Sequence, residues 1–527
     1  MIRNYRIFES FEMDFTPGMN IIVGDNDAGK STVLEAVHLA LTAKINGKPL
    51  AYELSPFLFN ADVTAAYFGD LANGKTPSPP EIIIDLFLSK SDETAPLAGS
   101  NNLLGVDSPG VRIRVALSPQ YASEYLTFVT ADPSTNKLIP AEYFVVEWLA
   151  FSGNGLTFRS IPATSSFIDA SSIKLQNGVD YHLQAIIREQ LDPKDRVELS
   201  RSYRSARETF SDHPAVKAVN GKLSGTKGDV SDKELSLAID ISQRYTWESS
   251  LVTHLDGLPF QFVGDGEQNT LKILLALNRK AGDSHVILIE EPENHLSFAS
   301  LNMLIWKIAD KCKDKQVLLT THSSYVLNKL GIGNLILQSA VGGTRISDLS
   351  DDTQDYFMKL SGYDTLRLVL ARGVILVEGP SDELIVQRAY MDTHGGKLPI
   401  EDGIDVINVR GLSAKRFLDV AMPLQKKAAV VTDNDGDPAA AAARYAEYAA
   451  ESFITIHVGA DPSLTTLEPQ LLAANGLSAM NSILGKSYTT EAELLNYMKN
   501  EKTTVALKIF ESDSSITMPE YIQNAVV

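Results

Sequence analysis

Three groups of residues in this sequence have types and spacings that could support chemistry. Residues 24–31, Gly-Asp-Asn-Asp-Ala-Gly-Lys-Ser, match the pattern GxxxxGK[ST], whose glycines let backbone amides surround phosphate groups. In this pattern Lys30 reaches the β and γ phosphates, and the Ser31 hydroxyl ligates Mg²⁺. The segment follows an apolar run at 19–23 and precedes a helical pattern, so we expect a strand, a phosphate-binding loop and a helix in that order.

The second group is an acidic pair behind another apolar run. Residues 286–289 predict a buried strand, and Glu290 and Glu291 follow it directly. At the end of a core strand, Glu290 can hold the Mg²⁺ environment and Glu291 can polarise an attacking water. A core strand with a charged end is the alternative. Further on, His322 also follows a strand-like run, but taken alone such a histidine is more often a structural turn residue than a γ-phosphate sensor.

The third group is a set of carboxylates behind two further apolar runs. Glu378 and Asp382 follow the first run, and Asp433, Asp435 and Asp437 follow the second. Because alternate residues at a strand end point the same way, we expect the aspartates to converge. Carboxylates this close repel one another and need a compensating cation, for which a divalent metal ion is suited.

The aspartate segment has two structural alternatives, an EF-hand loop and an Asp-Gly turn. An EF-hand loop has a Glu at its twelfth position, whereas this segment has Arg444 there and lacks the later ligands. An ordinary Asp-Gly turn remains an alternative for either acidic group taken alone. The occurrence of two strand-ended acidic sets in one α/β unit favours the metal site.

The segments around these groups predict several structural units. From 177 to 210 the pattern becomes helical and basic, with Arg201, Arg204 and Arg207 on adjacent turns, which indicates a helical insertion. These arginines could face DNA, although a solvated or dimer-facing helix is the favoured interpretation. The stretch 342–355, rich in Gly, Ser and Asp, is the best candidate for a linker.

Composition limits the possible classes of protein. A chain of 527 residues with 44% hydrophobic and 21% charged residues is typical of a multidomain globular protein. Neither a membrane span nor a secretory signal is visible, and the single cysteine, Cys312, fits a reducing compartment, so we expect a cytoplasmic protein. The net charge, 47 − 66 = −19, argues against binding nucleic acid by overall basicity, so any DNA contact must be local.

The phosphate-binding loop, together with residues 4–6, 289–293 and 321–323, resembles the ABC-type ATPase head shared by RecF, SMC and OLD proteins. That resemblance implies ATP sandwiched between two heads, and therefore a homodimer or higher oligomer. Residues 264–268, placed just before an expected helix at 271–277, look like a divergent signature segment. The nucleotide-binding residues implied are Gly24, Asn26, Gly29, Lys30, Ser31, Thr32, Glu290, His322 and Gly266, with Glu291 as a catalytic residue.

The carboxylate set resembles the Toprim domain of topoisomerases, primases and OLD nucleases. In the same resemblance, Glu468 looks like an additional OLD-type metal ligand. Lys502 looks like the lysine that stabilises developing phosphate charge, with Lys508 as a rival. The catalytic residues that the resemblance implies are Glu378, Asp382, Asp433, Asp435 and Lys502. The metal ligands that it implies are Glu378, Asp382, Asp433, Asp435, Asp437 and Glu468, and Ser31 would bind the ion of the nucleotide.

The resemblances together predict an α/β protein: an ABC-type P-loop ATPase head with a helical insertion, followed by a Rossmann-like Toprim domain. The expected boundaries are 1–165 and 241–345 for the head, 166–240 for the insertion and 365–527 for the Toprim domain.

The hypothesis is an ATP-gated DNA endonuclease of the OLD family that uses two Mg²⁺ or Mn²⁺ ions about 4 Å apart, with one more ion at the nucleotide. A role in defence against phage, with partner proteins, is compatible with it. The alternative is a RecF- or SMC-like ATP-driven DNA-binding or scaffold protein whose Toprim domain is catalytically inactive. A primase is disfavoured because one cysteine cannot build the zinc-binding module.

Overall fold

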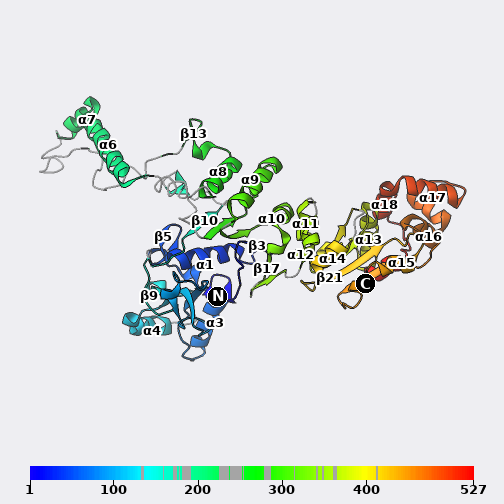
Figure 1. Ribbon diagram of the computed structural model, residues 1–527, viewed down its shortest axis with the longest axis horizontal. Helices are drawn as coiled ribbons and strands as arrows, with labels where there is room; N and C mark the ends of the chain where they lie inside the picture. Colours follow the sequence, from blue (N-terminus) through cyan, green and yellow to red (C-terminus); the bar gives the residue numbers. More distant parts are fainter. Residues whose placement is uncertain are drawn as a thin grey trace. The chain divides into compact units, whose positions relative to one another are not determined.

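The computed structural model divides the chain into two compact units (Figure 1). The first unit comprises Met1–Ser10 and Ser31–Thr320, and the second comprises Phe11–Lys30 and Thr321–Val527. None of the helices in the described part of the chain has the length and apolarity needed to cross a membrane. The structure describes residues 1–25, 27–131, 136–157, 160–169, 175–176, 179–180, 191–224, 237, 252, 254–277, 286–313, 315–339, 342–346, 349–359, 365–410 and 414–526.

The first unit contains an antiparallel and a parallel arrangement of strands. Strands β1, β6, β8 and β9 pair in that order, all antiparallel. Strand β15 lies between β10 and β16, and both pairings are parallel. The β15 sequence is a continuous apolar run, as expected for a strand that is covered on both faces. Its last residue is Glu290, so the parallel strands place a carboxylate at their carboxyl edge.

The elements of the first unit are as follows. Its strands are β1 (Ile2–Tyr5), β2 (Phe8–Phe11, which ends on the first residue of the second unit's segment), β4 (Lys44–Ile45), β5 (Lys48–Pro49), β6 (Ile82–Phe87), β7 (Ala98–Gly99), β8 (Ser108–Leu117), β9 (Phe144–Ala150), β10 (Ser165–Asp169), β11 (Leu175–Gln176), β12 (Val179–Asp180), β13 (His254–Leu255), β14 (Leu258–Pro259), β15 (Val286–Glu290) and β16 (Gln316–Thr320). Its helices are α1 (Lys30–Thr42, which begins on the last residue of the second unit's segment), α2 (Leu50–Glu53), α3 (Ala61–Ala72), α4 (Ala122–Ala131), α6 (Pro193–Ser211), α7 (Pro214–Ser224), α8 (Asp265–Leu277) and α9 (Phe298–Lys311).

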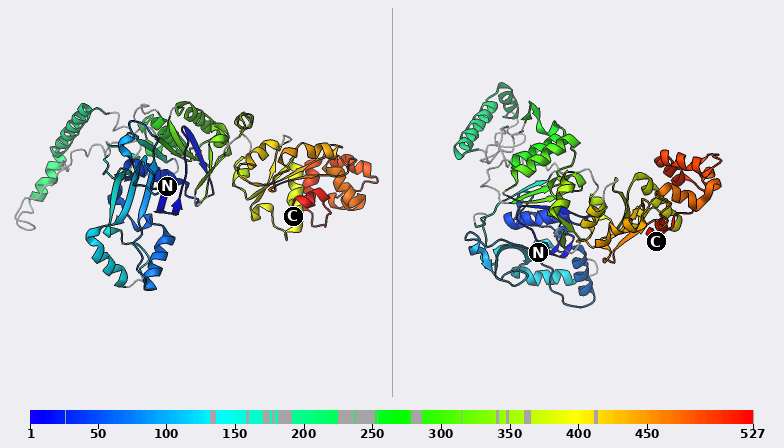
Figure 2. Two further views of the ribbon diagram at one scale, coloured as in Figure 1. Left: turned by 60° about the horizontal axis from the view of Figure 1, so that its bottom comes forward. Right: turned by 45° about the vertical axis from the view of Figure 1, so that its right-hand side comes forward.

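The second unit contains a four-stranded parallel sheet in the order β20-β19-β21-β22. One face of this sheet, which includes Val377 and Val431, packs in a single apolar core with helices α13, α16, α17, α18 and α19. Among them, α16, α17 and α18 group together in the orange and red part of the ribbon (Figure 2). Elsewhere in the unit, β17 pairs parallel with β3 and antiparallel with β18.

The elements of the second unit are as follows. Its strands are β3 (Met19–Val23), β17 (Leu335–Gln338), β18 (Gly343–Arg345), β19 (Gly373–Val377), β20 (Ile404–Asn408), β21 (Lys427–Thr432) and β22 (Ile454–Val458). Its helices are α10 (Ser324–Leu330), α11 (Asp351–Lys359), α12 (Thr365–Leu370), α13 (Pro380–Thr393), α14 (Lys415–Ala421), α15 (Pro438–Ala443), α16 (Leu467–Leu484), α17 (Glu491–Asn500), α18 (Lys502–Glu511) and α19 (Glu520–Ala525).

The structure confirms the α/β class and every strand expected beside a candidate site, but three local expectations differ from it. The helix expected from residue 177 begins only at α6, where Pro193 occupies the first turn after the N-cap Asp192. Before it, Val179–Asp180 form a strand. Residues 181–190 lie outside the described residues. The expected linker at 342–355 contains β18 and the start of α11.

The third difference concerns the segment expected to precede a helix at 271–277. Helix α8 begins at Asp265, so the signature-like residues form its first turn. Within the range expected as the insertion, β10 pairs in parallel with β15, whereas α6 and α7 are helical as expected. The exact domain boundaries stay predictions.

Candidate functional site

The phosphate-binding loop connects β3 to α1 and is closed around its own lysine. Lys30 Nζ donates to the carbonyl oxygens of Gly24 at 3.0 Å and Asp25 at 2.9 Å. A Cβ at Gly24 would lie 2.8 Å from the carbonyl oxygen of Gln338, and Gly29 has a φ of 89°, so both positions require glycine. Backbone amides and a lysine held in this way suit phosphate groups. The predicted residue Asn26 lies outside the described residues.

The acidic pair lies in the first unit, as does Ser31 at the start of α1. The Ser31 hydroxyl donates to Glu290 Oε1, and the Glu290 side chain is buried at the end of β15. The Glu291 carboxylate accepts a hydrogen bond from Asn294 Nδ2 at 2.7 Å, and its backbone has a φ of 43°. The next residue of α1, Thr32, is also buried. A hydroxyl and a carboxylate that meet in this way are oxygen ligands of the kind that Mg²⁺ prefers.

Two further predicted nucleotide residues have different surroundings. His322 is exposed and follows Thr321, whose backbone N–H donates to the Ile22 carbonyl at 3.3 Å within the second unit. In the first unit, Gly266 lies in the first turn of α8. A Cβ there would lie 2.3 Å from the His295 carbonyl oxygen, so this position tolerates only glycine. The positive end of a helix at such a glycine is compatible with binding an anion.

The Toprim-like carboxylates gather at the carboxyl ends of β19 and β21. Glu378 follows β19, and its Oε1 accepts hydrogen bonds from the Thr432 hydroxyl and, at 3.1 Å, from the Asp433 backbone N–H. Asp382 lies in the first turn of α13, where its Oδ2 accepts from the Gly379 N–H at 3.1 Å. Glu468, in the first turn of α16, is buried at 3% exposure. Parallel strands and helix N-termini therefore bring Glu378, Asp382 and Glu468 close enough to Asp433 for their charges to act on it.

Lys502 is the lysine that joins this cluster. Its Nζ lies 3.2 Å from Glu468 Oε1. Lys508, the rival, instead donates to the Leu484 carbonyl oxygen at 2.7 Å. Of the two lysines, the geometry places Lys502 beside the carboxylates.

The carboxylates strongly perturb one another. Burial and the negative charges of Asp382, Glu378 and Glu468 together raise the pKa of Asp433 to about 8, although Lys502 acts in the opposite direction. Burial and Glu378 raise the pKa of Asp382 to about 6. Within the described part of the chain, Asp433 Oδ1 is buried with no hydrogen-bond partner. A buried oxygen of this kind among like charges is suited to a cation.

Asp435 and Asp437 do not join the cluster, which corrects the expectation that all three aspartates converge. Asp435 has a φ of 49°, so the alternation of the preceding strand does not continue through it. Its Oδ2 instead pairs with Arg444 at 3.0 Å, and its side chain is 60% exposed. Asp437 caps α15 by accepting from the Ala440 N–H at 3.0 Å.

A divalent ion fits this donor set by chemistry, although the carboxylates are not drawn together around one point. Among the described residues, no three His, Cys, Asp or Glu side chains have the arrangement of a metal centre. Glu378, Asp382, Asp433 and Glu468 nevertheless supply hard oxygen ligands around an oxygen without a partner. Ion binding would therefore require these carboxylate side chains to move closer to one another.

Sequence reasoning missed two residues that shape the site. Asn434 is fully buried, and its amide donates to the carbonyl oxygens of Gly459 at 3.0 Å and Asp461 at 2.8 Å, which fixes the loop after Asp433. Tyr521 is buried in α19, where burial and the charge of Asp433 raise the pKa of its hydroxyl. An Asn between two acids was a visible signal, whereas the C-terminal tyrosine had none.

Comparison with known proteins identifies both parts of the chain. A model described as an AAA domain matches residues 1–67, and a second AAA domain model matches 154–328. The model described as "Overcoming lysogenization defect protein-like, TOPRIM domain" matches residues 369–435. The chain is therefore an α/β protein that combines an AAA-type ATPase domain with a Toprim domain. Its Toprim domain is of the OLD-like type, as the resemblance predicted.

Individual relatives cover only parts of the chain. The DNA replication and repair protein RecF of Lactococcus lactis subsp. lactis is 48% identical over 42 residues, which are 8% of this chain and 12% of RecF, so the match spans about an eighth of that relative. The C-terminal region of the Burkholderia pseudomallei OLD protein is 24% identical, with a TM-score of 0.25, and covers 30% of this chain and 96% of that region. The SMC head domain from Thermotoga maritima is 12% identical, with a TM-score of 0.28, and covers 66% and 97%.

Proposed function

We propose that this chain is an ATP-regulated, divalent-metal-dependent endonuclease that hydrolyses phosphodiester bonds in DNA. The observation that carries the proposal is Asp433, a half-buried carboxyl whose buried Oδ1 has no hydrogen-bond partner among the described residues and on which the charges of Asp382, Glu378 and Glu468 act. The OLD-like Toprim match covers Glu378, Asp382 and Asp433, which gives the cluster a nuclease context.

The residues of the site have different proposed roles, in metal binding and in stabilising the phosphate. Glu378, Asp382, Asp433 and Glu468 would hold Mg²⁺ or Mn²⁺, and Asp435 would join them if it leaves Arg444. The ions, when bound, would supply Lewis-acid activation of water and of the phosphate. Lys502, which lies beside Glu468, would stabilise the charge that develops on the phosphate.

ATP binding belongs to the phosphate-binding loop. In the proposal, Lys30 and Ser31 hold the phosphates and their Mg²⁺, with Glu290 supporting the ion and Glu291 polarising the attacking water. Two chains would share the nucleotides as a homodimer, with His322 and Gly266 as further contacts, and the nucleotide state would gate cleavage. We further propose a cytoplasmic role in defence against phage, with partner proteins, on the basis of the resemblance to OLD proteins.

The test is incubation of supercoiled plasmid with the protein and Mg²⁺ or Mn²⁺, with and without ATP. Metal-dependent nicking or linearisation that disappears in Asp433→Asn supports the proposal. Asp513→Asn is the matched control, because Asp513 is an exposed acid of the same unit, and it should cleave like the wild type. Cleavage by Asp433→Asn at the wild-type rate would refute the assignment.

The same assay distinguishes a second candidate function from the nuclease. A RecF- or SMC-like DNA-binding or scaffold protein with an inactive Toprim domain would bind ATP and DNA without cleaving in any metal. The absence of a preformed three-ligand metal centre among the described residues is the observation that favours it. Wild-type protein that shifts plasmid in a gel but never nicks it would establish this alternative.

A further inference from the structure

A pocket of about 230 Å³ opens directly beside the carboxylate cluster, and no step proposed above uses it. It lies at the carboxyl ends of β19 and β21, the edge at which open α/β sheets bind ligands. Glu378 is both a member of the cluster and part of the pocket wall. The residues that line it are Leu376, Val377, Glu378, Val409, Ala414, Lys415, Val430, Val431, Thr432, Arg444 and Tyr445.

The pocket has two chemically different parts. Its apolar lining, called the floor below, includes strand residues such as Leu376 and Val430 and also Ala414, which directly precedes α14. Two cations, Lys415 and Arg444, contribute to the lining together with Glu378. The volume is several times the roughly 30 Å³ that one water occupies, so the pocket exceeds the size of a single ion.

Both cations are held in exchangeable ion pairs. Arg444 Nη2 lies 3.0 Å from Asp435 Oδ2, and the two side chains are 49% and 60% exposed. Lys415 Nζ lies 2.6 Å from Glu447 Oε1, with 42% and 58% exposure. Solvent-exposed pairs of this kind contribute little free energy, so an incoming phosphate can replace the carboxylate partner.

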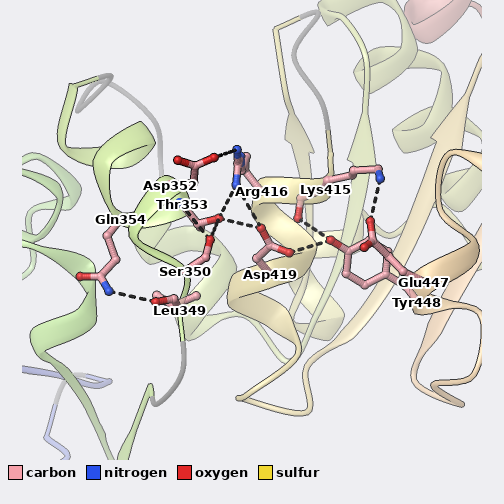
Figure 3. A network of polar contacts seen from close by, with 10 residues as sticks. All are labelled: Leu349, Ser350, Asp352, Thr353, Gln354, Lys415, Arg416, Asp419, Glu447 and Tyr448. Carbon is pink, nitrogen blue, oxygen red and sulfur yellow. Dashed lines mark hydrogen bonds and ion pairs between the residues drawn. The ribbon is translucent and has the colours of Figure 1, made fainter.

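The wall formed by α14 is fixed in place by a network with α11 (Figure 3). The Thr353 hydroxyl donates to Asp419 Oδ2 at 2.7 Å and accepts from Arg416 Nη1 at 2.7 Å. Tyr448 donates to the other Asp419 oxygen at 2.6 Å. Because Asp419 accepts hydrogen bonds from both Thr353 and Tyr448, these contacts hold α14, which contributes Lys415 to the pocket lining.

We propose that this pocket receives the base and sugar of the nucleotide that flanks the scissile phosphate of a DNA strand. A purely apolar ligand would leave Arg444 and Lys415 unused, and a bare anion would leave the apolar floor unused. A nucleotide matches both, since its flat base suits the floor and its phosphate suits the cations. Because Glu378 belongs to both the pocket lining and the carboxylate cluster, a nucleotide in the pocket would have its adjacent phosphodiester next to the cluster. This inference rests on the proposed nuclease function.

The experiment measures binding of a fluorescein-labelled single strand of about four nucleotides, the size of a small single-strand site, by anisotropy in Ca²⁺ with saturating ATP. Ala414→Leu adds carbon atoms to the pocket floor and should weaken binding by about tenfold, the loss expected for one base contact. The matched control is Ala439→Leu, because Ala439 is exposed on α15 outside the pocket, and it should bind like the wild type.

Three further outcomes decide the inference. Equal affinity of wild type, Ala414→Leu and Ala439→Leu overturns it, even if the wild type cleaves plasmid. If Ala414→Leu fails to fold, two other measurements take its place: Arg444→Gln must weaken binding of the strand, and a strand carrying 5-iodouracil must crosslink to Tyr445. If neither result is obtained, the inference is overturned. A wild type that binds the strand in an Ala414-dependent way but cleaves no plasmid supports the pocket and refutes the nuclease proposal.

Discussion

The phosphate-binding loop and the carboxylate cluster differ in whether their polar and charged groups have partners within the protein. Lys30 donates to two carbonyl oxygens of its own loop, and Ser31 donates to Glu290, so these groups have internal partners. Asp433 instead keeps a buried oxygen without a partner in the described part of the chain, among other carboxylates. The loop is a preorganised site whose ligand replaces existing hydrogen bonds, whereas the cluster is electrostatically incomplete until a cation enters.

The largest effect expected from this difference is on cleavage. Asp433→Asn removes the charge that most needs a cation, so we expect plasmid cleavage to fall on the order of a thousandfold, since each catalytic electrostatic contact is worth about two to three orders of magnitude. ATP affinity should be unchanged, because Lys30 and its loop are untouched. Single-turnover cleavage and a fluorescent ATP analogue measure the two properties, and a parallel loss of ATP binding would contradict the separation of the sites.

Lys30→Ala tests the other side of the comparison. Loss of the lysine that meets the phosphates should weaken ATP binding by about a hundredfold, equivalent to about 2.7 kcal/mol. Stabilisation of the second unit by Mg²⁺ should persist, because the carboxylates do not depend on the lysine. Titration of the ATP analogue and thermal unfolding with Mg²⁺ check these outcomes. If Lys30→Ala also abolished the Mg²⁺ stabilisation, the two sites would not be independent.

The pH dependence of stability provides a third test of the difference between the carboxylate cluster and the phosphate-binding loop. The folded-state pKa of Asp433 is raised to about 8 and that of Asp382 to about 6, both from an ordinary value of 3.8. Their contribution to stability is therefore complete below about pH 4 and is lost as the pH rises through these values. The metal-free protein should lose thermal stability between about pH 5 and about pH 8, and Mg²⁺ should restore more of it at the higher pH.

The measurement is Tm in EDTA and in Mg²⁺ across that range. Asp433→Asn should flatten the profile in EDTA, because the amide does not ionise. Asp435→Ala should leave the same profile intact even though cleavage falls, because its side chain is 60% exposed and paired with Arg444. An EDTA profile that is flat in the wild type would mean that the carboxylates do not repel one another as described.

Much of both sites could be predicted from the sequence, because strand ends are visible as apolar runs. Val286–Glu290 and Gly373–Val377 form strands as expected, and the charged residues behind them lie at sheet edges. Pairing of Lys502 with Glu468 could be suggested only by resemblance, since the two residues belong to different helices. The pocket beside Glu378 could not be predicted, because it depends on how α14 packs against the sheet.

The expectation for Asp437 was wrong for a specific physical reason. It assumed that the alternation of β21 continues beyond the strand, but Asp435 adopts a positive φ and the backbone turns toward α15. Alternation is a property of extended backbone alone. A sequence of Asp, Asn and Gly favours such a turn, so the turn chemistry, rather than the strand period, determines where the last carboxylate points.

The smallest expected effect is that of substitutions at Asp437, which distinguish a helix-capping role of this residue from a metal-binding role. Its carboxylate accepts from the Ala440 N–H at 3.0 Å as the N-cap of α15. Asp437→Ala should therefore cost about 1 kcal/mol and speed amide exchange at Ala440, whereas Asp437→Asn, an equally good cap, should change neither. Amide hydrogen exchange and plasmid cleavage distinguish the two roles. A large loss of cleavage in Asp437→Asn with unchanged exchange would return Asp437 to the metal site, since Asn keeps the cap but not the charge.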